Sequence, residues 1–200
     1  MSKVITISRE FGSGGRELAL KLAERLQIAY YDREIITEIA KKTSLAEQYV
    51  QQVVERRPSH WFPLTTGYSF YLNVDPLQEQ NLSIYQEQCR IIKEMAAKSD
   101  CILVGRCADY ILQNRNPFRI FVYAGLEERL ARCRKRLPSE EQLSDKELKQ
   151  RILSIDKNRA AYYHFYTGQV WGDKAHYDLC INTAFCPIDK LVPAIQEMLS

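Results

Sequence analysis

Short apolar runs alternate along this chain with segments of helical periodicity, and this alternation constrains the fold more than any other feature. In the first helical segment, Leu18, Leu22 and Leu26 recur at four-residue spacing, which is typical of an amphipathic helix. Strands that alternate with helices form a parallel sheet covered on both faces, so we expect an α/β fold. The runs with the length and composition of strands are residues 4–7, 28–31, 101–104, 119–123 and 177–181.

Two segments depart from the alternation. Residues 34–81 are long and end in an aromatic-rich stretch, whereas residues 134–149 are short, charged and contain Pro138. We expect the first to be helices and a loop inserted between two strands, and the second to be an exposed excursion between two helices. The 200 residues suit a single domain. Its core is then formed by residues 1–33, 82–133 and 150–200.

Composition excludes several classes of protein. The net charge of +3 is too small for a protein that binds nucleic acid by charge alone. Six cysteines without C-x-x-C spacing indicate buried thiols in a reducing compartment rather than a disulfide framework or a zinc site. The chain enters a strand without a signal peptide, and no apolar run approaches the ~20 residues of a membrane span. We therefore expect a cytoplasmic protein without nucleic-acid or membrane partners, and homo-oligomerisation stays open.

The most informative segment joins the first strand to the first helix and reads Ser8-Arg-Glu-Phe-Gly-Ser-Gly-Gly-Arg-Glu17. Backbone N–H groups of such a turn converge on an anion, and the helix N-terminus adds about half a positive charge. Arg16 lies in the first helical turn, where a cation is unfavourable unless an anion binds nearby. The segment is either a phosphate-binding loop or an ordinary connection with flexible glycines, and Arg16 favours the first.

The loop departs from the strict phosphate-binding pattern G-x-x-x-x-G-K-[ST]. With Gly14 as the second glycine, Arg9 occupies the first glycine position and Gly15 the lysine position. Arg16 then replaces the residue whose hydroxyl reaches Mg²⁺. Arg16 is our candidate to supply the charge of the missing lysine, although the two side chains differ in geometry.

The loop resembles that of the cytidylate kinase-like family, a branch of the P-loop nucleoside monophosphate kinases whose loop reads S-R-x-x-G-S-G-G-R-x. The resemblance implies a three-layer P-loop NTPase fold with a five-stranded parallel sheet. It also implies a nucleoside-monophosphate-binding insertion at residues 34–81 and a lid at residues 134–149. Four further segments match the family in order: Tyr31-Asp-Arg-Glu34, Val104-Gly-Arg-Cys-Ala-Asp109, Asp156-Lys-Asn-Arg159 and Tyr177-Asp-Leu-Cys-Ile-Asn182.

Phosphoryl transfer needs cations around the transferred group in a closed, dry site, and the arginine fork suits phosphate oxygens. Arg129, Arg132 and Arg136 are three and four residues apart, so they share one helix face that is able to meet phosphates. The alternative is a solvated basic face paired with nearby acids. From this group and the loop we assign catalytic roles to Arg16, Arg132 and Arg136.

Polar residues near the ends of predicted strands are candidates for binding an acceptor, because ligands of open α/β sheets bind there. The resemblance implies that Asp32 and Arg33 face the acceptor nucleotide and that Arg106 lines its phosphate. It also implies that Asp156 and Arg159 hold a cytosine base and the acceptor phosphate, and a carboxylate is able to accept from the cytosine amino group. The alternative for this last pair is an ion pair on a helix surface.

Our leading hypothesis is an ATP-dependent kinase that phosphorylates a small acceptor. We expect this acceptor to be a nucleoside monophosphate, and CMP and dCMP are the first candidates. Mg²⁺ bridges the ATP phosphates, and its protein ligands are unassigned. A nucleotide-binding regulatory protein without efficient turnover is the second hypothesis. The aromatic segments 59–76 and 162–166 either stack on a base or form core or subunit contacts. The residues assigned to ATP are Gly12, Ser13, Gly14, Gly15, Arg16 and Glu17.

Overall fold

Five parallel strands form one sheet in the order β2-β3-β1-β4-β5. The computed structural model describes residues 3–55, 76–137 and 143–199. The predicted five-stranded parallel α/β fold is confirmed, and each strand lies within two residues of its expected bounds. The strands are β1 (Val4–Arg9), β2 (Ala29–Tyr31), β3 (Cys101–Val104), β4 (Phe118–Tyr123) and β5 (Leu179–Asn182).

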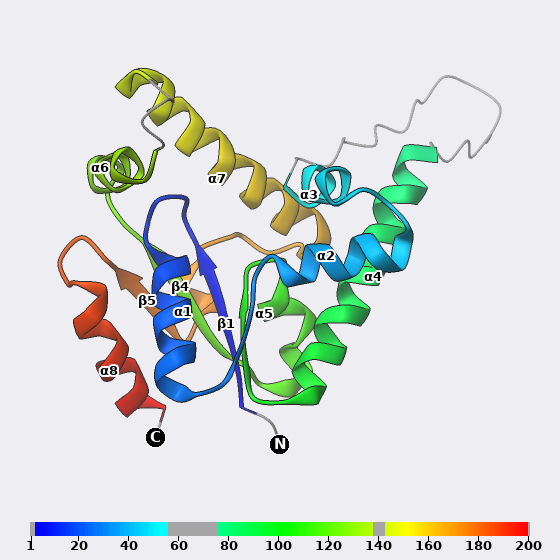
Figure 1. Cartoon of the computed structure of the whole chain (residues 1–200), viewed down its shortest axis with the longest axis horizontal. Helices are drawn as coiled ribbons and strands as arrows, with labels where there is room; N and C mark the ends of the chain where they lie inside the picture. The colour runs from blue at the N-terminus through cyan, green and yellow to red at the C-terminus, as the bar shows by residue number, and fades with distance from the viewer. Residues whose placement is uncertain (1–2, 56–75, 138–142, 200) are drawn as a thin grey trace.

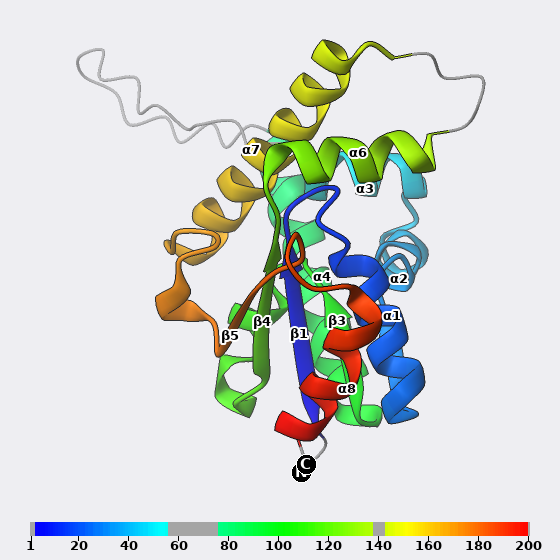
Figure 2. The same cartoon turned by 90° about the vertical axis from the view of Figure 1, so that its left-hand side faces the viewer.

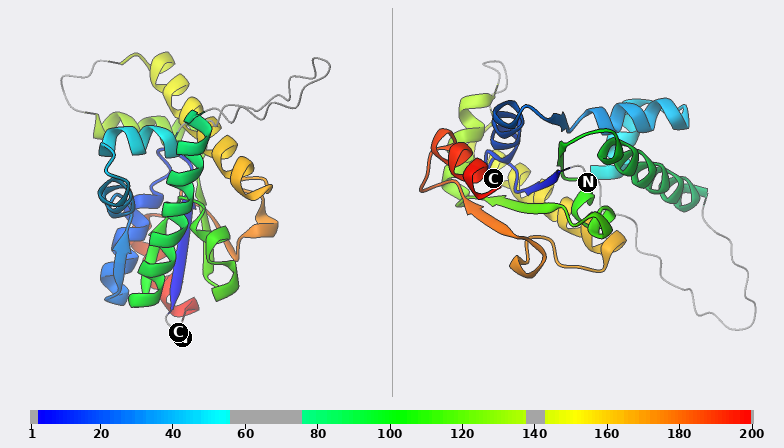
Figure 3. Two further views of the ribbon diagram at one scale, coloured as in Figure 1. Left: turned by 90° about the vertical axis from the view of Figure 1, so that its right-hand side faces the viewer. Right: turned by 90° about the horizontal axis from the view of Figure 1, so that it is seen from below.

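Helices cover both faces of the sheet and complete three layers (Figures 1 and 3). Alternate residues of a strand point to opposite faces. Ile5 and Ile7 therefore pack beneath α1 and α8, while Val4 and Leu103 belong to the cluster on the other face. The helices of the two faces are α1 (Gly15–Leu26) and α8 (Ile188–Met198) on one, and α4 (Pro76–Lys98) and the short α5 (Ala108–Ile111) on the other.

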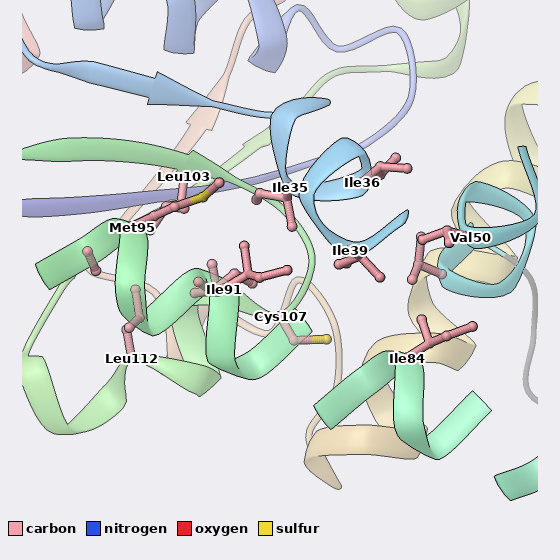
Figure 4. Close-up of a cluster of buried hydrophobic side chains, with 14 of the residues drawn as sticks. Ile35, Ile36, Ile39, Val50, Ile84, Ile91, Met95, Leu103, Cys107 and Leu112 are labelled. Atoms are coloured by element: carbon pink, nitrogen blue, oxygen red, sulfur yellow. The ribbon is translucent and has the colours of Figure 1, made fainter. Parts of the chain in front are cut away.

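The chain after β2 forms α2 (Glu34–Thr43) and α3 (Glu47–Glu55). Ile35 and Ile39 of α2 are fully buried in the same cluster as Leu103 of the sheet, and Figure 4 shows them directed towards α4. The first helix of the predicted insertion is thus packed into the main core. The aromatic segment predicted at residues 59–76 lies outside the described residues except for Pro76, where α4 begins.

Two helices pass beyond the carboxyl ends of the strands, above the sheet in Figures 1 and 2. They are α6 (Leu126–Arg136) and α7 (Asp145–Thr167). Ser144 and Glu147 form a capping box that begins α7. The far end of α7 returns to the core, where Tyr162 and Tyr163 are buried. Residues 138–142 of the predicted lid lie outside the described residues.

The remaining elements are two 3₁₀ turns, η1 (Gln113–Arg115) and η2 (Lys174–His176). All six cysteines are free thiols, but the expectation that they are buried holds for Cys101 and Cys107 alone, since Cys89, Cys133 and Cys186 are partly exposed. Cys180 is exposed because it lies on the edge strand β5 and points away from the cluster that includes Leu179 and Ile181. Within the described part of the chain, no helix combines the length and apolar character needed to cross a membrane.

Candidate active site

A cleft of about 530 Å³ lies at the carboxyl ends of β1, β2 and β3, beneath α6 and α7. Of the described residues, eight arginines but two carboxylates, Glu10 and Asp32, line it. This excess of positive charge favours a ligand with several negative charges. The arginines come from six segments of the chain: Arg9, Arg16, Arg33, Arg106, Arg132, Arg136, Arg151 and Arg159.

The glycine loop forms the floor of the cleft between β1 and α1. Gly12 and Gly14 adopt φ values of +78° and +86°, in the left-handed region that favours glycine. A Cβ on Gly12 would lie 2.8 Å from Sγ of Cys133, so the loop packs directly against α6. Because Gly14, Gly15 and Arg16 line the cleft, the N-terminus of α1 opens into it. The N–H groups of this first turn have no intrahelical partner and are suited to an anion.

Polar contacts from the end of β5 and from α6 hold the loop in place. The Oγ of buried Ser13 donates to the carbonyl of Glu10 at 2.9 Å, and the Ser13 carbonyl accepts the hydroxyl of Thr183 at 2.6 Å. Arg132 donates to the carbonyl of Gly12 at 3.1 Å and to Oγ1 of Thr183 at 3.2 Å. Ser13 thus lies below the cleft surface, while Arg132 reaches that surface and also supports the loop.

The carboxylate of Asp156 ties the loop to α6 and α7. Its Oδ1 accepts the backbone N–H of Phe11 at 2.8 Å, and its Oδ2 pairs with Nη1 of Arg129. Arg159, one turn along α7, has Nη1 3.8 Å from Oδ1 of Asp156 and donates to the carbonyl of Arg9 at 3.1 Å. Asp156 is therefore directed at the protein itself, while Arg159 lines the cleft.

The three arginines expected to share a face of α6 divide into two groups. Arg132 and Arg136 line the cleft, whereas Arg129 is buried beside Asp156 with 6% of its surface exposed. Arg136 also pairs with Glu17 at 2.5 Å. Glu17 is not among the residues that line the cleft, so its contact with a ligand would pass through Arg136.

Asp32 follows β2 and joins two cationic side chains of the cleft. It is 4% exposed, its Oδ1 lies 3.3 Å from Nη2 of Arg9, and its Oδ2 lies 2.6 Å from Nη2 of Arg16. Its backbone N–H donates to Glu34 at 2.9 Å, which fixes the turn into α2. Burial, and then the nearby charge of Arg159, lower the pKa of the Arg9 guanidinium. Arg9 and Arg16 therefore share one carboxylate, and positive charge exceeds negative charge in this part of the cleft.

A strained turn after β3 places Arg106 in the cleft. Gly105, Arg106 and Cys107 have φ values of +71°, +57° and +55°, and such a conformation is uncommon for residues other than glycine. Buried Gln88 donates to the Arg106 carbonyl at 3.0 Å, and Arg106 donates to the carbonyl of Val54 at 3.3 Å. Arg33, at the start of α2, is exposed and lines the same cleft.

The residues of the cleft do not form a ready-made site for Mg²⁺. Among the described residues, no group of three or more histidine, cysteine, aspartate or glutamate side chains is placed to hold a metal. The two cleft carboxylates both face arginines, Asp32 as above and Glu10 with Oε2 3.6 Å from Nε of Arg129.

The model of the cytidylate kinase-like family matches residues 4–184. The chain belongs to this family. Among solved structures, an uncharacterized protein from Eubacterium ventriosum ATCC 27560 is 27% identical with a TM-score of 0.70, over 98% of this chain and 97% of its own. A comparison with curated proteins finds no match.

Shikimate kinases share the fold at lower identity. The enzyme from Bacteroides thetaiotaomicron has a TM-score of 0.58, and the one from Acinetobacter baumannii, in complex with shikimate, has 0.55; each is 15% identical. Both cover 100% of this chain, and 99% and 93% of their own length, respectively. This likeness confirms the P-loop kinase fold. Together with the family, it supports a nucleotide-dependent kinase-like phosphotransferase.

The loop pattern placed Arg9 at a glycine position and did not predict that its side chain enters the cleft. No pattern predicted the role of Thr183 either, because a lone threonine after a strand belongs to no motif. One feature of the sequence could have predicted the position of the Arg9 side chain: an arginine occupies the first glycine position of the loop pattern while a glycine occupies the lysine position.

Proposed function

We propose that this protein transfers the terminal phosphoryl group of ATP to a small phosphate-bearing acceptor, with CMP and dCMP as the first candidates. The observation that carries this proposal is the convergence of eight arginines from separate segments on one cleft beside the glycine loop. A triphosphate and a monophosphate held together present the negative charge that such a cleft would neutralise.

The cleft divides into a donor side and an acceptor side in this proposal. The loop glycines, Arg16 and the N-terminus of α1 would hold the ATP phosphates, with Arg132 and Arg136 facing them from α6. Asp32, Arg33, Arg106 and Arg159 would hold the acceptor. An acceptor oxygen forms a bond to the terminal phosphorus while the bond to the bridging oxygen breaks, and its electron pair stays with ADP. Positioning and charge neutralisation supply the catalysis.

The role of Mg²⁺ and the selection of cytosine both depend on the binding of the two nucleotides. Mg²⁺ would arrive with the nucleotide and supply charge neutralisation when bound. Selection of cytosine by Asp156 requires that this carboxylate become accessible when the acceptor enters, because Asp156 does not line the cleft and its oxygens face Phe11 and Arg129. The cytoplasmic location, the absence of nucleic-acid partners and any homo-oligomer stay predictions.

A regulatory protein that binds nucleotide without efficient turnover is the second candidate. Gly15 at the lysine position favours it, and so does Arg16, whose side chain is half exposed and held by Asp32. An assay separates the two candidates. The protein is incubated with ATP, Mg²⁺ and a panel of nucleoside monophosphates plus shikimate, and ADP release and the phosphorylated acceptor are both measured.

Stimulation of ADP release by CMP or dCMP, with equal formation of the diphosphate, supports the kinase. If no acceptor stimulates ADP release while ATP still raises the melting temperature, the regulatory function is correct instead. The variant Arg16→Ala is expected to weaken ATP binding about tenfold or more, since it removes a charged hydrogen-bond donor. Arg25→Ala is the matched control, because Arg25 lies at the opposite end of α1 and contacts Gln196.

A further inference from the structure

Two of the three departures from the phosphate-loop pattern, Arg9 and Gly15, are in direct contact. A Cβ on Gly15 would lie 2.5 Å from Cβ of Arg9 and 3.1 Å from its Cγ. It would also lie 3.1 Å from Cβ of Val122 on the neighbouring strand. The stem of Arg9 therefore fills the space that a side chain at position 15 would need, so the arginine at one position requires the glycine at the other.

The guanidinium of Arg9 continues from this contact towards the centre of the cleft. A Cβ on Gly105, after β3, would overlap Nη1 of Arg9, so a second glycine also makes room for this side chain. Nη2 lies 3.3 Å from Oδ1 of Asp32. The charged group thus lies beside the ends of β2 and β3, and Arg106 and Arg159 line the same cleft.

The charge of Arg9 is only partly compensated. Its side chain is 15% exposed, and the carboxylate beside it is shared with Arg16. Burial lowers the pKa of its guanidinium, and the neighbouring charges of Arg159 and Arg106 lower it further. A largely buried cation without a full partner is costly, and an anion in the cleft would relieve that cost.

We propose that Arg9 contacts the transferred phosphoryl group and supplies the positive charge that a lysine at position 15 supplies in the ordinary loop. The cation reaches the phosphates from the end of β1, instead of from the start of α1. This inference rests on the proposed phosphoryl transfer. In that step the N–H groups of Arg9 donate to oxygens of the terminal phosphate while its bond to ADP breaks. Arg16, which is more exposed, is left to the remaining phosphates.

The first test keeps the stem of Arg9 and removes its charge. Arg9→Met is expected to lower kcat at least a hundredfold, which is the usual effect of losing one electrostatic contact in a transition state. It should also abolish any preference for ATP over ADP in binding, measured by calorimetry. A purely structural role would lower the melting temperature and weaken both nucleotides equally. Equal weakening, or a kcat within twofold of the wild type, overturns the proposal.

The second test restores the ordinary arrangement. Gly15→Lys alone creates the overlap with the Arg9 stem and is expected to lower the melting temperature. Arg9→Gly alone removes the cation. The double variant R9G/G15K removes the 2.5 Å overlap, keeps the 3.1 Å approach to Val122 and restores a cation, so its kcat should exceed that of Arg9→Gly by at least tenfold. Simple addition of the two single losses in melting temperature and kcat contradicts the proposal.

Different results contradict the proposed function and the proposed role of Arg9. If the wild-type protein phosphorylates no acceptor, the proposed function fails, and the preference for ATP over ADP still tests Arg9. If the wild type turns over and Arg9→Met does too, only the role of Arg9 is wrong.

Discussion

The carboxylate of Asp156 accepts the backbone N–H of Phe11 at 2.8 Å, across 145 positions of the sequence. This contact joins the middle of α7 to the glycine loop, and the same carboxylate pairs with Arg129 on α6. Three segments around the cleft therefore share one acceptor group. A ligand that shifts α7 would also shift the loop, because the two move with Asp156.

Loss of the Asp156 charge should destabilise the fold more than loss of an exposed charge. Asp156→Asn keeps an oxygen for Phe11 but leaves buried Arg129 with the more distant carboxylate of Glu10, 3.6 Å from its Nε, which costs about 2 kcal/mol. Asp156→Ala removes both contacts and should also weaken ATP binding. Urea unfolding measures the difference. Asp145→Asn is the control, since its exposed pair with Arg134 is worth less than about 1 kcal/mol. Equal effects of Asp156→Asn and Asp145→Asn would show that the buried pair does not matter.

Gly105 and Gly168 offer a matched pair of substitutions, because both have φ +71°. Alanine at either position meets the same backbone strain, about 1–2 kcal/mol. Around Gly168 nothing lies within 4 Å of an added Cβ, whereas at Gly105 the Cβ would overlap Arg9. We expect Gly105→Ala to reduce phosphoryl transfer at least tenfold and Gly168→Ala to leave it within twofold. Steady-state kinetics and melting temperatures check this, and comparable kinetic losses in both variants would be the contrary result.

Cys133 is a natural probe of nucleotide binding. It lines the cleft, and its Sγ lies against Gly12 of the loop. Burial raises the pKa of this thiol, so alkylation near neutral pH should be slow and should speed up as the pH rises. Bound ATP should slow alkylation of Cys133 at least fivefold and leave exposed Cys180 unaffected, as measured by mass spectrometry of the peptides. Equal protection of both cysteines would argue against ATP binding in the cleft.

Asp109 gives the fold a dependence on pH. It is 3% exposed, its Oδ2 accepts the hydroxyl of Tyr163 at 2.7 Å, and burial raises its pKa. A raised pKa means that the native state holds the proton more tightly than the unfolded chain does. Stability is therefore lost as the pH rises from the unfolded pKa of about 3.9 through the folded one.

The variant Asp109→Asn lacks this titration. Its free energy of unfolding relative to the wild type should rise between pH 4 and pH 7, as followed by urea denaturation at several pH values. A difference that stays constant over this range would mean that Asp109 has an ordinary pKa in the folded protein.

Much of the fold was predictable because the spacing of apolar residues along the chain shows which side chains of a helix or strand are buried. The five strands, the glycine loop and the collection of arginines at strand ends all followed from short segments of sequence. The split between Arg129 and its neighbours on α6 did not, because the partner that buries Arg129 is Asp156, 27 residues away on another helix. The position of the Arg9 side chain was not predictable either, because a sequence pattern does not show that this side chain packs against Gly15.

The overlap at Gly15 has a consequence for related chains. If the Cβ of residue 9 and a side chain at position 15 exclude each other, the two positions should change together across P-loop kinases, with arginine at position 9 accompanied by glycine at position 15, and lysine at position 15 accompanied by glycine at position 9. Searches that demand the loop lysine would pass over every chain with the first pair. Chains with arginine at position 9 and glycine at position 15 would then form a lineage in which the phosphate-binding cation moved from the start of α1 to the end of β1, with both positions changing together.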